Sequence, residues 1–246
     1  MIEINNLTKS FGKNLIWKDV SFQIEDGETL AVIGKSGWGK SVLLKHLNAL
    51  MYPDSGEVII DGQCVFDLNY SELRLMRQRF GILFQGGALF DSINTFENIA
   101  FPLRYFTNKT EGEIKKDVEE ALDMVNLKDA GSKATSELSG GMRKRVGLAR
   151  AIILKPDYLL YDEPTSGLDP QTSDEINELI VSMADSFDLT SIVITHDMHS
   201  VLSIAEKVAF LDSQKLSWFG SIDEMKKSEH PPLVEFTTAS EYKIKA

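Results

Sequence analysis

Apolar residues in the first third of the chain form short runs that are rich in β-branched side chains, with glycine at turn-like positions between them. Such runs predict β-strands. One helix is predicted to interrupt them, over residues 40–50, where Val42, Leu43 and Leu47 recur at helical spacing. The predicted strands of this region cover residues 2–7, 29–33, 57–60 and 80–84.

The pattern becomes helical from residue 95 to residue 154. Ile114, Val118 and Leu122 fall on one face of an otherwise charged segment. This spacing predicts helices that pack on one side and remain exposed on the other.

Apolar runs return after Pro156, with one predicted helix, over residues 170–187, among them. The strands predicted here cover residues 158–161, 191–195 and 208–211. Strands that alternate with helices predict an α/β fold with a mostly parallel sheet and right-handed crossovers.

Composition narrows the possible partners and compartments. The 246 residues are 43% hydrophobic, which is enough for a sizeable core, and the net charge of −11 argues against a nucleic-acid partner. The single cysteine, Cys64, cannot form an internal disulfide, which fits a reducing compartment. The first residues lack a signal-peptide pattern, and every apolar run is far shorter than the ~20 residues that cross a bilayer. We therefore expect a cytoplasmic protein that another chain holds at any membrane where it works.

A glycine-rich run between the strand at 29–33 and the helix from residue 40 has the complete P-loop pattern. Its glycines allow backbone N–H groups to converge on phosphate oxygens. Lys40 is predicted to contact the β- and γ-phosphates of ATP, and the Ser41 hydroxyl to bind Mg²⁺. A turn without a ligand is the structural alternative. The run is Gly34-Lys35-Ser36-Gly37-Trp38-Gly39-Lys40-Ser41.

Two adjacent carboxylates end the apolar run at residues 158–161. Ligands of open α/β sheets bind at the carboxyl ends of the strands, so Asp162 and Glu163 are expected beside the P-loop. Asp162 is predicted to support Mg²⁺, and Glu163 to take the proton of the attacking water. Without the P-loop, the same pair would be explained as a turn or a helix cap.

A second glycine cluster, Leu138-Ser139-Gly140-Gly141-Met142, precedes a predicted helix. Ser139 has an ordinary explanation as an N-cap. Two glycines weaken the first helical turn unless something approaches the backbone closely, and a phosphate is the natural candidate. Since the P-loop already holds the phosphates of one nucleotide, this cluster has no obvious ligand within the same chain.

The order of these motifs, with Gln85 before the glycine cluster and His196 after Asp162, resembles that of the ATP-binding-cassette (ABC) ATPases. The resemblance implies a P-loop NTPase core, an N-terminal antiparallel β subdomain and an inserted helical subdomain. It also implies a head-to-tail homodimer in which Ser139, Gly140 and Gly141 contact the γ-phosphate of ATP held by the second copy.

The same resemblance assigns roles to residues that are weak signals alone. Gln85 would sense Mg²⁺ and the lytic water, and His196 would contact the γ-phosphate. Residues 166–169 would run along the dimer seam. Phe11 would stack on adenine, although a core or turn position explains a phenylalanine equally well. Trp38 and Lys35 depart from the family pattern, which has a small residue and a proline there.

Two segments, residues 85–92 and 97–104, resemble the ATPases of MCE-type (Mla-like) phospholipid transporters, as does Met142 followed by three basic residues. This implies integral-membrane permease partners, an MCE-domain lipid-binding protein and a place on the cytoplasmic face of the inner membrane. An ABC ATPase for amino acids, lipoproteins or drugs is the alternative. A soluble ABC ATPase of cluster assembly or DNA maintenance and a non-catalytic structural protein are less favoured.

The predicted domains are an ABC ATPase domain over residues 1–220, with the helical subdomain at about 95–154, and a C-terminal extension over residues 221–246. The extension contains charges, Pro231 and Pro232 and few apolar residues, so a loosely ordered end is expected. Its alternative role is to brace a neighbouring subunit.

Overall fold

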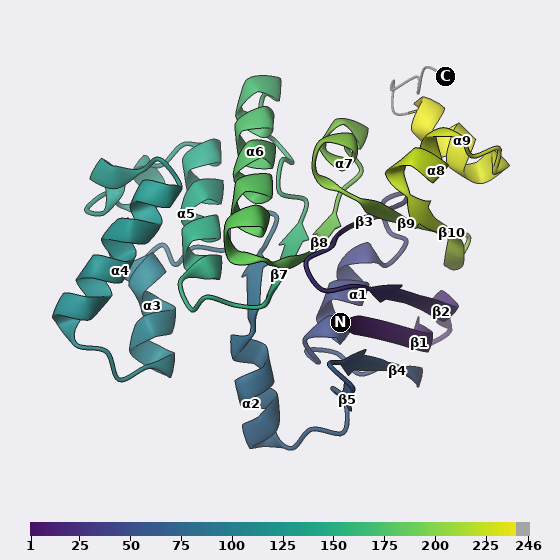
Figure 1. The fold of residues 1–246 in the computed structure, drawn as a ribbon, viewed down its shortest axis with the longest axis horizontal. Coiled ribbons are helices and arrows are strands. Elements are labelled where there is room, and N and C mark those ends of the chain that lie inside the picture. Colours follow the sequence, from purple (N-terminus) through teal and green to yellow (C-terminus); the bar gives the residue numbers. More distant parts are fainter. Residues whose placement is uncertain (240–246) are drawn as a thin grey trace.

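The core of the protein is a six-stranded sheet with the strand order β10-β9-β3-β8-β7-β6, seen in a computed structural model that describes residues 1–239 (Figure 1). The five strands from β9 to β6 are parallel, and β10 pairs with β9 in the antiparallel sense. The strands are β3 (Thr29–Ile33), β6 (Phe80–Leu83), β7 (Tyr158–Asp162), β8 (Thr190–Ile194), β9 (Lys207–Asp212) and β10 (Lys215–Ser221).

A second, antiparallel sheet of four strands lies beside the core sheet, with helix α1 (Lys40–Leu47) against it (Figure 1). Side chains of β1, β2, α1 and the core sheet share one hydrophobic cluster. The strands, in the order β2-β1-β4-β5, are β1 (Ile2–Phe11), β2 (Asn14–Ile24), β4 (Ser55–Ile60) and β5 (Gln63–Cys64).

Three helices form a lobe at one end of the molecule (Figure 1). They are α3 (Thr95–Phe106), α4 (Glu111–Met124) and α5 (Gly140–Ile152), of which α5 contacts β6, with two 3₁₀ turns, Lys128–Ala130 and Thr135–Glu137, between α4 and α5. Helix α5 packs unusually close to β6, because a Cβ at Gly81 would lie 2.3 Å from the Ala151 carbonyl oxygen. A Cβ at Gly147 would lie 2.7 Å from Leu83 Cδ1, so the lobe is tightly joined to the sheet.

The remaining helices are α2 (Tyr70–Gln78), α6 (Pro170–Phe187), α7 (Met198–Ile204), α8 (Ile222–Lys226) and α9 (Pro231–Ala239). Helix α6 has the predicted bounds, with Asp169 as its N-cap and a proline in its first turn. None of the helices within residues 1–239 combines the length and apolarity needed to span a bilayer.

The prediction of a single helix, over residues 40–50, in the first third of the chain is wrong in two respects. The helix predicted over residues 40–50 ends at Leu47, since Asn48 is its C-cap and Ala49 has a left-handed backbone. A second helix, α2, was not expected there, because only Leu73 and Met76 of its nine residues are buried and its sequence is mostly polar.

The expectation of a loosely ordered C-terminal end is wrong for residues 222–239. Helices α8 and α9 bury Ile222, Met225, Leu233 and Phe236 in a cluster with residues of β9 and α7. Few apolar residues are present, but those few are spaced to face the sheet. Residues 240–246 of the predicted extension lie outside the described residues, and the extension's bracing role and the predicted domain boundaries stay predictions.

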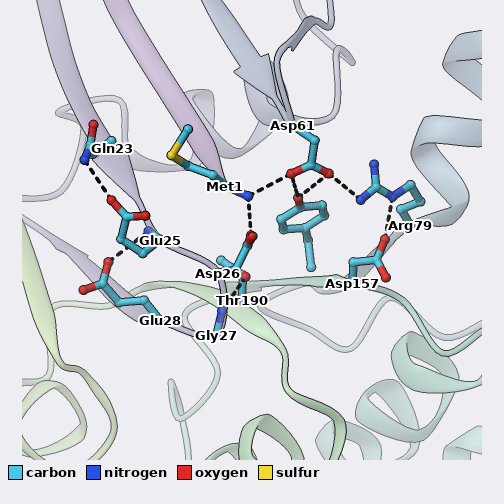
Figure 2. Close-up of polar contacts among 11 residues, drawn as sticks. Met1, Gln23, Glu25, Asp26, Gly27, Glu28, Asp61, Arg79, Asp157 and Thr190 are labelled. Carbon is cyan, nitrogen blue, oxygen red and sulfur yellow. Dashed lines mark hydrogen bonds and ion pairs between the residues drawn. The ribbon is translucent and has the colours of Figure 1, made fainter.

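A polar network joins the two sheets (Figure 2). Asp61, in the turn after β4, accepts hydrogen bonds from the Met1 amine at 2.8 Å and from Arg79 at 2.6 Å. Arg79 also pairs with Asp157, just before β7. Desolvation would raise the pKa of Asp61, but the hydrogen bonds from Met1, Arg79 and Tyr158 lower it to about 2. The network therefore links the start of β1, the end of β4 and the start of β7.

Candidate nucleotide site

The predicted site residues follow four neighbouring strands of the core sheet. The P-loop follows β3, His196 follows β8, Asp162 and Glu163 end β7, and Gln85 follows β6. Because these strands are parallel and adjacent, their carboxyl ends meet at one edge. The edge holds a cavity of about 360 Å³. It is lined by Ile16, Ser36, Gly37, Gly39, Lys40, Ser41, Val42, Gln85, Asp162, Glu163, Ile194 and His196.

The P-loop has the backbone that its glycines were expected to allow. Gly34, Gly37 and Gly39 have φ values of 148°, 84° and 82°, which side chains rarely tolerate. A Cβ at Gly34 would lie 2.4 Å from the Leu211 carbonyl oxygen, and one at Gly39 would lie 2.2 Å from Ile16 Cγ2. Gly37 faces open space, which leaves its backbone accessible to a ligand.

Lys40 lies inside the loop and is 7% exposed. Its Nζ donates to the Gly34 carbonyl at 2.6 Å and to the Lys35 carbonyl at 3.2 Å. Burial lowers the pKa of Lys40, while the Glu163 and Asp162 carboxylates act in the opposite direction. A buried cation facing a cavity is suited to an anion such as a phosphate.

Ser41 and Asp162 meet at the edge of the cavity. The Ser41 hydroxyl donates to Asp162 Oδ1 at 3.0 Å. A hydroxyl and a carboxylate are oxygen ligands that suit Mg²⁺, which proteins commonly bind through one or two such groups together with substrate phosphates. Within residues 1–239 no three His, Cys, Asp or Glu side chains are arranged to hold a metal ion by themselves. The residues present therefore fit a Mg²⁺ ion that arrives with a phosphate ligand.

Glu163 is held at several points. Its carboxylate oxygens both lie 2.9 Å from His196 Nδ1, and its side chain is mostly buried whereas that of His196 is exposed. Its backbone has a φ of 51°, and its N–H donates to the Ile194 carbonyl at 2.8 Å. A left-handed backbone is uncommon and somewhat strained at a glutamate, and together with the two contacts it restrains the direction of the Glu163 side chain.

Gln85 is exposed at the end of β6, and its Nε2 donates to Ser166 Oγ at 3.3 Å. Ser166 belongs to a second cavity of about 340 Å³ that continues from the first, since Glu163 and His196 line both. Gly167 and Leu168 also line it. The segment predicted to run along a dimer seam is thus in contact with the candidate catalytic residues.

Ser139 does not lie with these residues. It is the exposed N-cap of α5, where its Oγ accepts from the Met142 N–H at 3.2 Å, and it lines neither cavity. Packing within the chain explains the glycine at position 141, because a Cβ there would lie 2.6 Å from Thr172 Cγ2. A Cβ at Gly140 would meet only Leu168, at an ordinary 3.4 Å. Packing within the chain therefore does not explain why residue 140 is a glycine.

A comparison with protein-family models bears on the family of the chain. Residues 17–166 match the family model described as ABC transporter. The chain belongs to the ABC transporter family. This match and the related structures below confirm the predicted family and the predicted ABC ATPase fold, whereas the individual residue roles stay predictions.

Solved structures of ABC cassettes share the whole architecture. The ATP-binding cassette MJ0796, solved as a dimer in a post-hydrolysis state bound to ADP and Pi, superposes with a TM-score of 0.82. It is 30% identical, and the match covers 90% of this chain and 99% of that one. A relative with this fold therefore binds nucleotide as a dimer.

Two relatives have names that refer to transport. The Mycobacterium tuberculosis protein "Probable ribonucleotide transport ATP-binding protein mkl" is 43% identical over 96% of this chain, which spans 66% of that protein. The Haemophilus influenzae "Intermembrane phospholipid transport system ATP-binding protein MlaF" is 41% identical over 96% of this chain and 89% of that protein. Both matches support an ABC ATP-binding protein of a transport system.

Some residues of this ABC site were missed or are placed unexpectedly. Ile16 and Val42 line the nucleotide cavity, but apolar residues in such positions carry no sequence signal. Phe11 is 48% exposed at the end of β1 and does not line that cavity, and Lys9 Nζ lies 5.6 Å from its ring centre. Trp38 is partly exposed, with Lys35 Nζ 5.9 Å from its ring centre.

Proposed function

We propose that this chain binds and hydrolyses ATP as the nucleotide-binding subunit of a membrane transporter. The observation that carries the proposal is the shared cavity of Lys40, Asp162 and Glu163 at the carboxyl edge of the sheet. A buried lysine, a metal-binding pair and a restrained carboxylate are the parts that ATP hydrolysis requires. The experiment that tests it is Mg²⁺-dependent release of phosphate from ATP by the purified chain.

The residues divide the chemistry between them. Lys40 and the P-loop N–H groups hold the phosphates, and Glu163 takes the proton of the attacking water. His196 orients Glu163 through their shared hydrogen bonds. Mg²⁺, held through Ser41 and Asp162, would supply charge neutralisation for the phosphates. The contact of Gln85 with Ser166 connects this chemistry to the predicted dimer seam.

A head-to-tail dimer accounts for the position of Ser139. Its exposed N-cap and the open backbone of Gly140 form no contact with the P-loop of their own chain, so a second copy is proposed to bring its nucleotide to them. The dimeric state of the cassette MJ0796 supports this arrangement. Each ATP would then lie between the P-loop of one copy and the Ser139 end of α5 in the other.

Mixing two inactive variants tests the shared site. Lys40→Ala removes the phosphate contact, and Ser139→Asp keeps a helix-capping oxygen but places a negative charge beside the phosphate. Each homodimer is expected to be inactive, whereas the heterodimer, purified through two different tags, is expected to regain ATPase activity from the one site that keeps both residues.

Ser221→Asp, at the N-cap of α8, is the matched control and is expected to leave ATPase activity unchanged. A purified heterodimer with no activity would mean that each site is built from one chain.

The proposed membrane partner is a permease that docks beside α3. A groove of about 340 Å³ there is bordered by Phe84, Phe90 and Phe101, which are exposed aromatic residues. Arg150 lies over Phe90 at 6.0 Å from its ring centre, so the groove is apolar with a basic edge. This chemistry suits an amphipathic helix of a partner. Such docking would place the chain on the cytoplasmic face of the inner membrane.

The proposed cargo is phospholipid, moved with the help of an MCE-domain lipid-binding protein. Similarity to MlaF over most of both chains supports this choice, together with the sequence of residues 85–104. A ribonucleotide is the second candidate, because the mycobacterial relative carries that name. Mass spectrometry of the intact transporter, with its bound small molecules, separates the two.

Phe101→Glu tests the docking groove. We expect the variant to bind ATP normally but to lose the permease during purification from membranes, because a carboxylate in an apolar groove is poorly solvated. Met124→Glu, at an exposed position of α4, is the control and should keep the permease. Retention of the permease by the Phe101 variant would exclude this groove as the docking site.

A further inference from the structure

Lys144 is a buried lysine that the proposed chemistry does not use. It lies on α5, five residues after Ser139, and is 4% exposed. Its Nζ donates to the backbone carbonyl of Glu163 at 2.8 Å. It forms no salt bridge with any of residues 1–239. Burying an ammonium without a paired carboxylate destabilises a protein, so packing alone is a poor reason for a lysine at this position.

The carbonyl that Lys144 holds belongs to the strained peptide of the candidate base. Glu163 has the left-handed backbone described above, and its N–H is fixed by the Ile194 carbonyl. Lys144 fixes the other side of the same residue. The strained conformation that aims the Glu163 side chain at His196 is thus held by β8 on one side and by α5 on the other.

Helix α5 connects this contact to its exposed end. Ser139 caps the helix, and Lys144 follows about 7.5 Å further along the axis, within the second turn. The helix is uninterrupted from Gly140 to Ile152, so its backbone hydrogen bonds link the Ser139 end to Lys144. A shift of the Ser139 end therefore moves the Lys144 ammonium with it.

We propose that Lys144 is a positioning residue that couples the Ser139 end of α5 to Glu163 of the same chain. This inference rests on the proposed head-to-tail dimer. There, Ser139 contacts the ATP held by the partner copy, while Glu163 acts on the ATP of its own P-loop. Binding of one nucleotide to the Ser139 end would then adjust the backbone of the base at the other nucleotide and raise its rate, so that a site whose neighbour is empty would work, but below the full rate.

Lys144→Met removes the donor and keeps an unbranched side chain of similar length. We expect kcat for ATP hydrolysis to fall about 10- to 100-fold, since small misplacements of a catalytic group have effects of this size, with ATP affinity changed less than about twofold. Lys144→Arg, which keeps an N–H donor, should recover part of the lost rate. Lys116→Met, at an exposed position of α4, is the control.

Two results of this comparison would overturn the proposal. One is an unchanged kcat for Lys144→Met. The other is a loss of ATP binding and kcat together with a lower melting temperature, which would assign Lys144 to folding alone.

The heterodimer of a Lys40→Ala chain and a Ser139→Asp chain shows in which chain Lys144→Met lowers the rate of ATP hydrolysis. Its one working site uses the P-loop and Glu163 of the Ser139→Asp chain and the α5 end of the Lys40→Ala chain. Lys144→Met placed in the Ser139→Asp chain is expected to lower the recovered rate at least about tenfold more than when placed in the Lys40→Ala chain.

The reverse order, or equal effects, would overturn the coupling of Lys144 to Glu163 in its own chain. A parent heterodimer without activity would instead reject the shared-site dimer, and the homodimer comparison of kcat with ATP affinity would still test the contact between Lys144 and Glu163.

Discussion

Glu163→Gln is expected to bind ATP normally and to hydrolyse it about 10² to 10⁴ times more slowly, the range that loss of a general base produces. Glutamine has nearly the same shape and retains a partner for His196 Nδ1, so the surrounding contacts persist. It cannot take a proton from water. The measurements are the affinity for a fluorescent ATP analogue and the single-turnover rate of phosphate release.

The same variant should accumulate as an ATP-bound dimer, because the nucleotide between the two copies is no longer consumed. Glu120→Gln, on the exposed side of α4, is the control for loss of one carboxylate and should behave like the parent protein. Normal hydrolysis by the Glu163 variant would remove Glu163 from its role as the base.

Lys40→Ala is expected to weaken ATP binding about 100-fold or more. Its ammonium is buried inside the P-loop, and loss of one partner from a buried, charge-assisted contact has an effect of this size. Two loop carbonyls, those of Gly34 and Lys35, also lose their donor, so the loop itself should become less ordered. Isothermal titration with ATP and Mg²⁺ measures the change.

Lys45→Ala is the matched control, since Lys45 is an exposed lysine of the same helix. It should keep the parent affinity. Equal affinities of the Lys40 variant and the parent protein would contradict a phosphate-binding role for the P-loop lysine, whatever the hydrolysis rates.

Strands buried on both faces were the most predictable part of the fold. The runs at β3, β7 and β8 are continuous apolar segments, and their predicted bounds agree with the structure to within about one residue. Helix α6 was equally clear, because Asp169 and Pro170 are a strong start signal and its apolar positions keep helical spacing.

Elements on the surface of the fold were harder to predict. Strand β2 alternates buried and exposed residues, with Trp17, Val20 and Phe22 facing inward, so its apolar content is diluted. Helix α2 has an Asn69 capping box, but only Leu73 and Met76 are buried in an otherwise polar sequence. Strand β10 is only partly buried, at the edge of the core sheet, and gave no apolar run.

Motifs located the candidate site, but not the contacts that support it. The P-loop and the Asp162-Glu163 pair could be found in sequence because their residue types and spacing are tied to phosphate and metal chemistry. The left-handed backbone of Glu163 and its contact with Lys144 depend on tertiary packing, which no local pattern encodes. Gly141 was predicted to face a phosphate, whereas Thr172 already explains its missing side chain.

Trp38 gives this protein an optical reporter of its own. The indole stands between Gly37 and Gly39 in the phosphate-binding loop, beside the Lys35 ammonium, so its emission is sensitive to charge that enters the loop. Trp17 is buried, and its indole N–H donates to the Gly39 carbonyl at 3.4 Å, which ties a second fluorophore to the same loop. Occupancy of the loop should therefore be visible in the ultraviolet without any added dye.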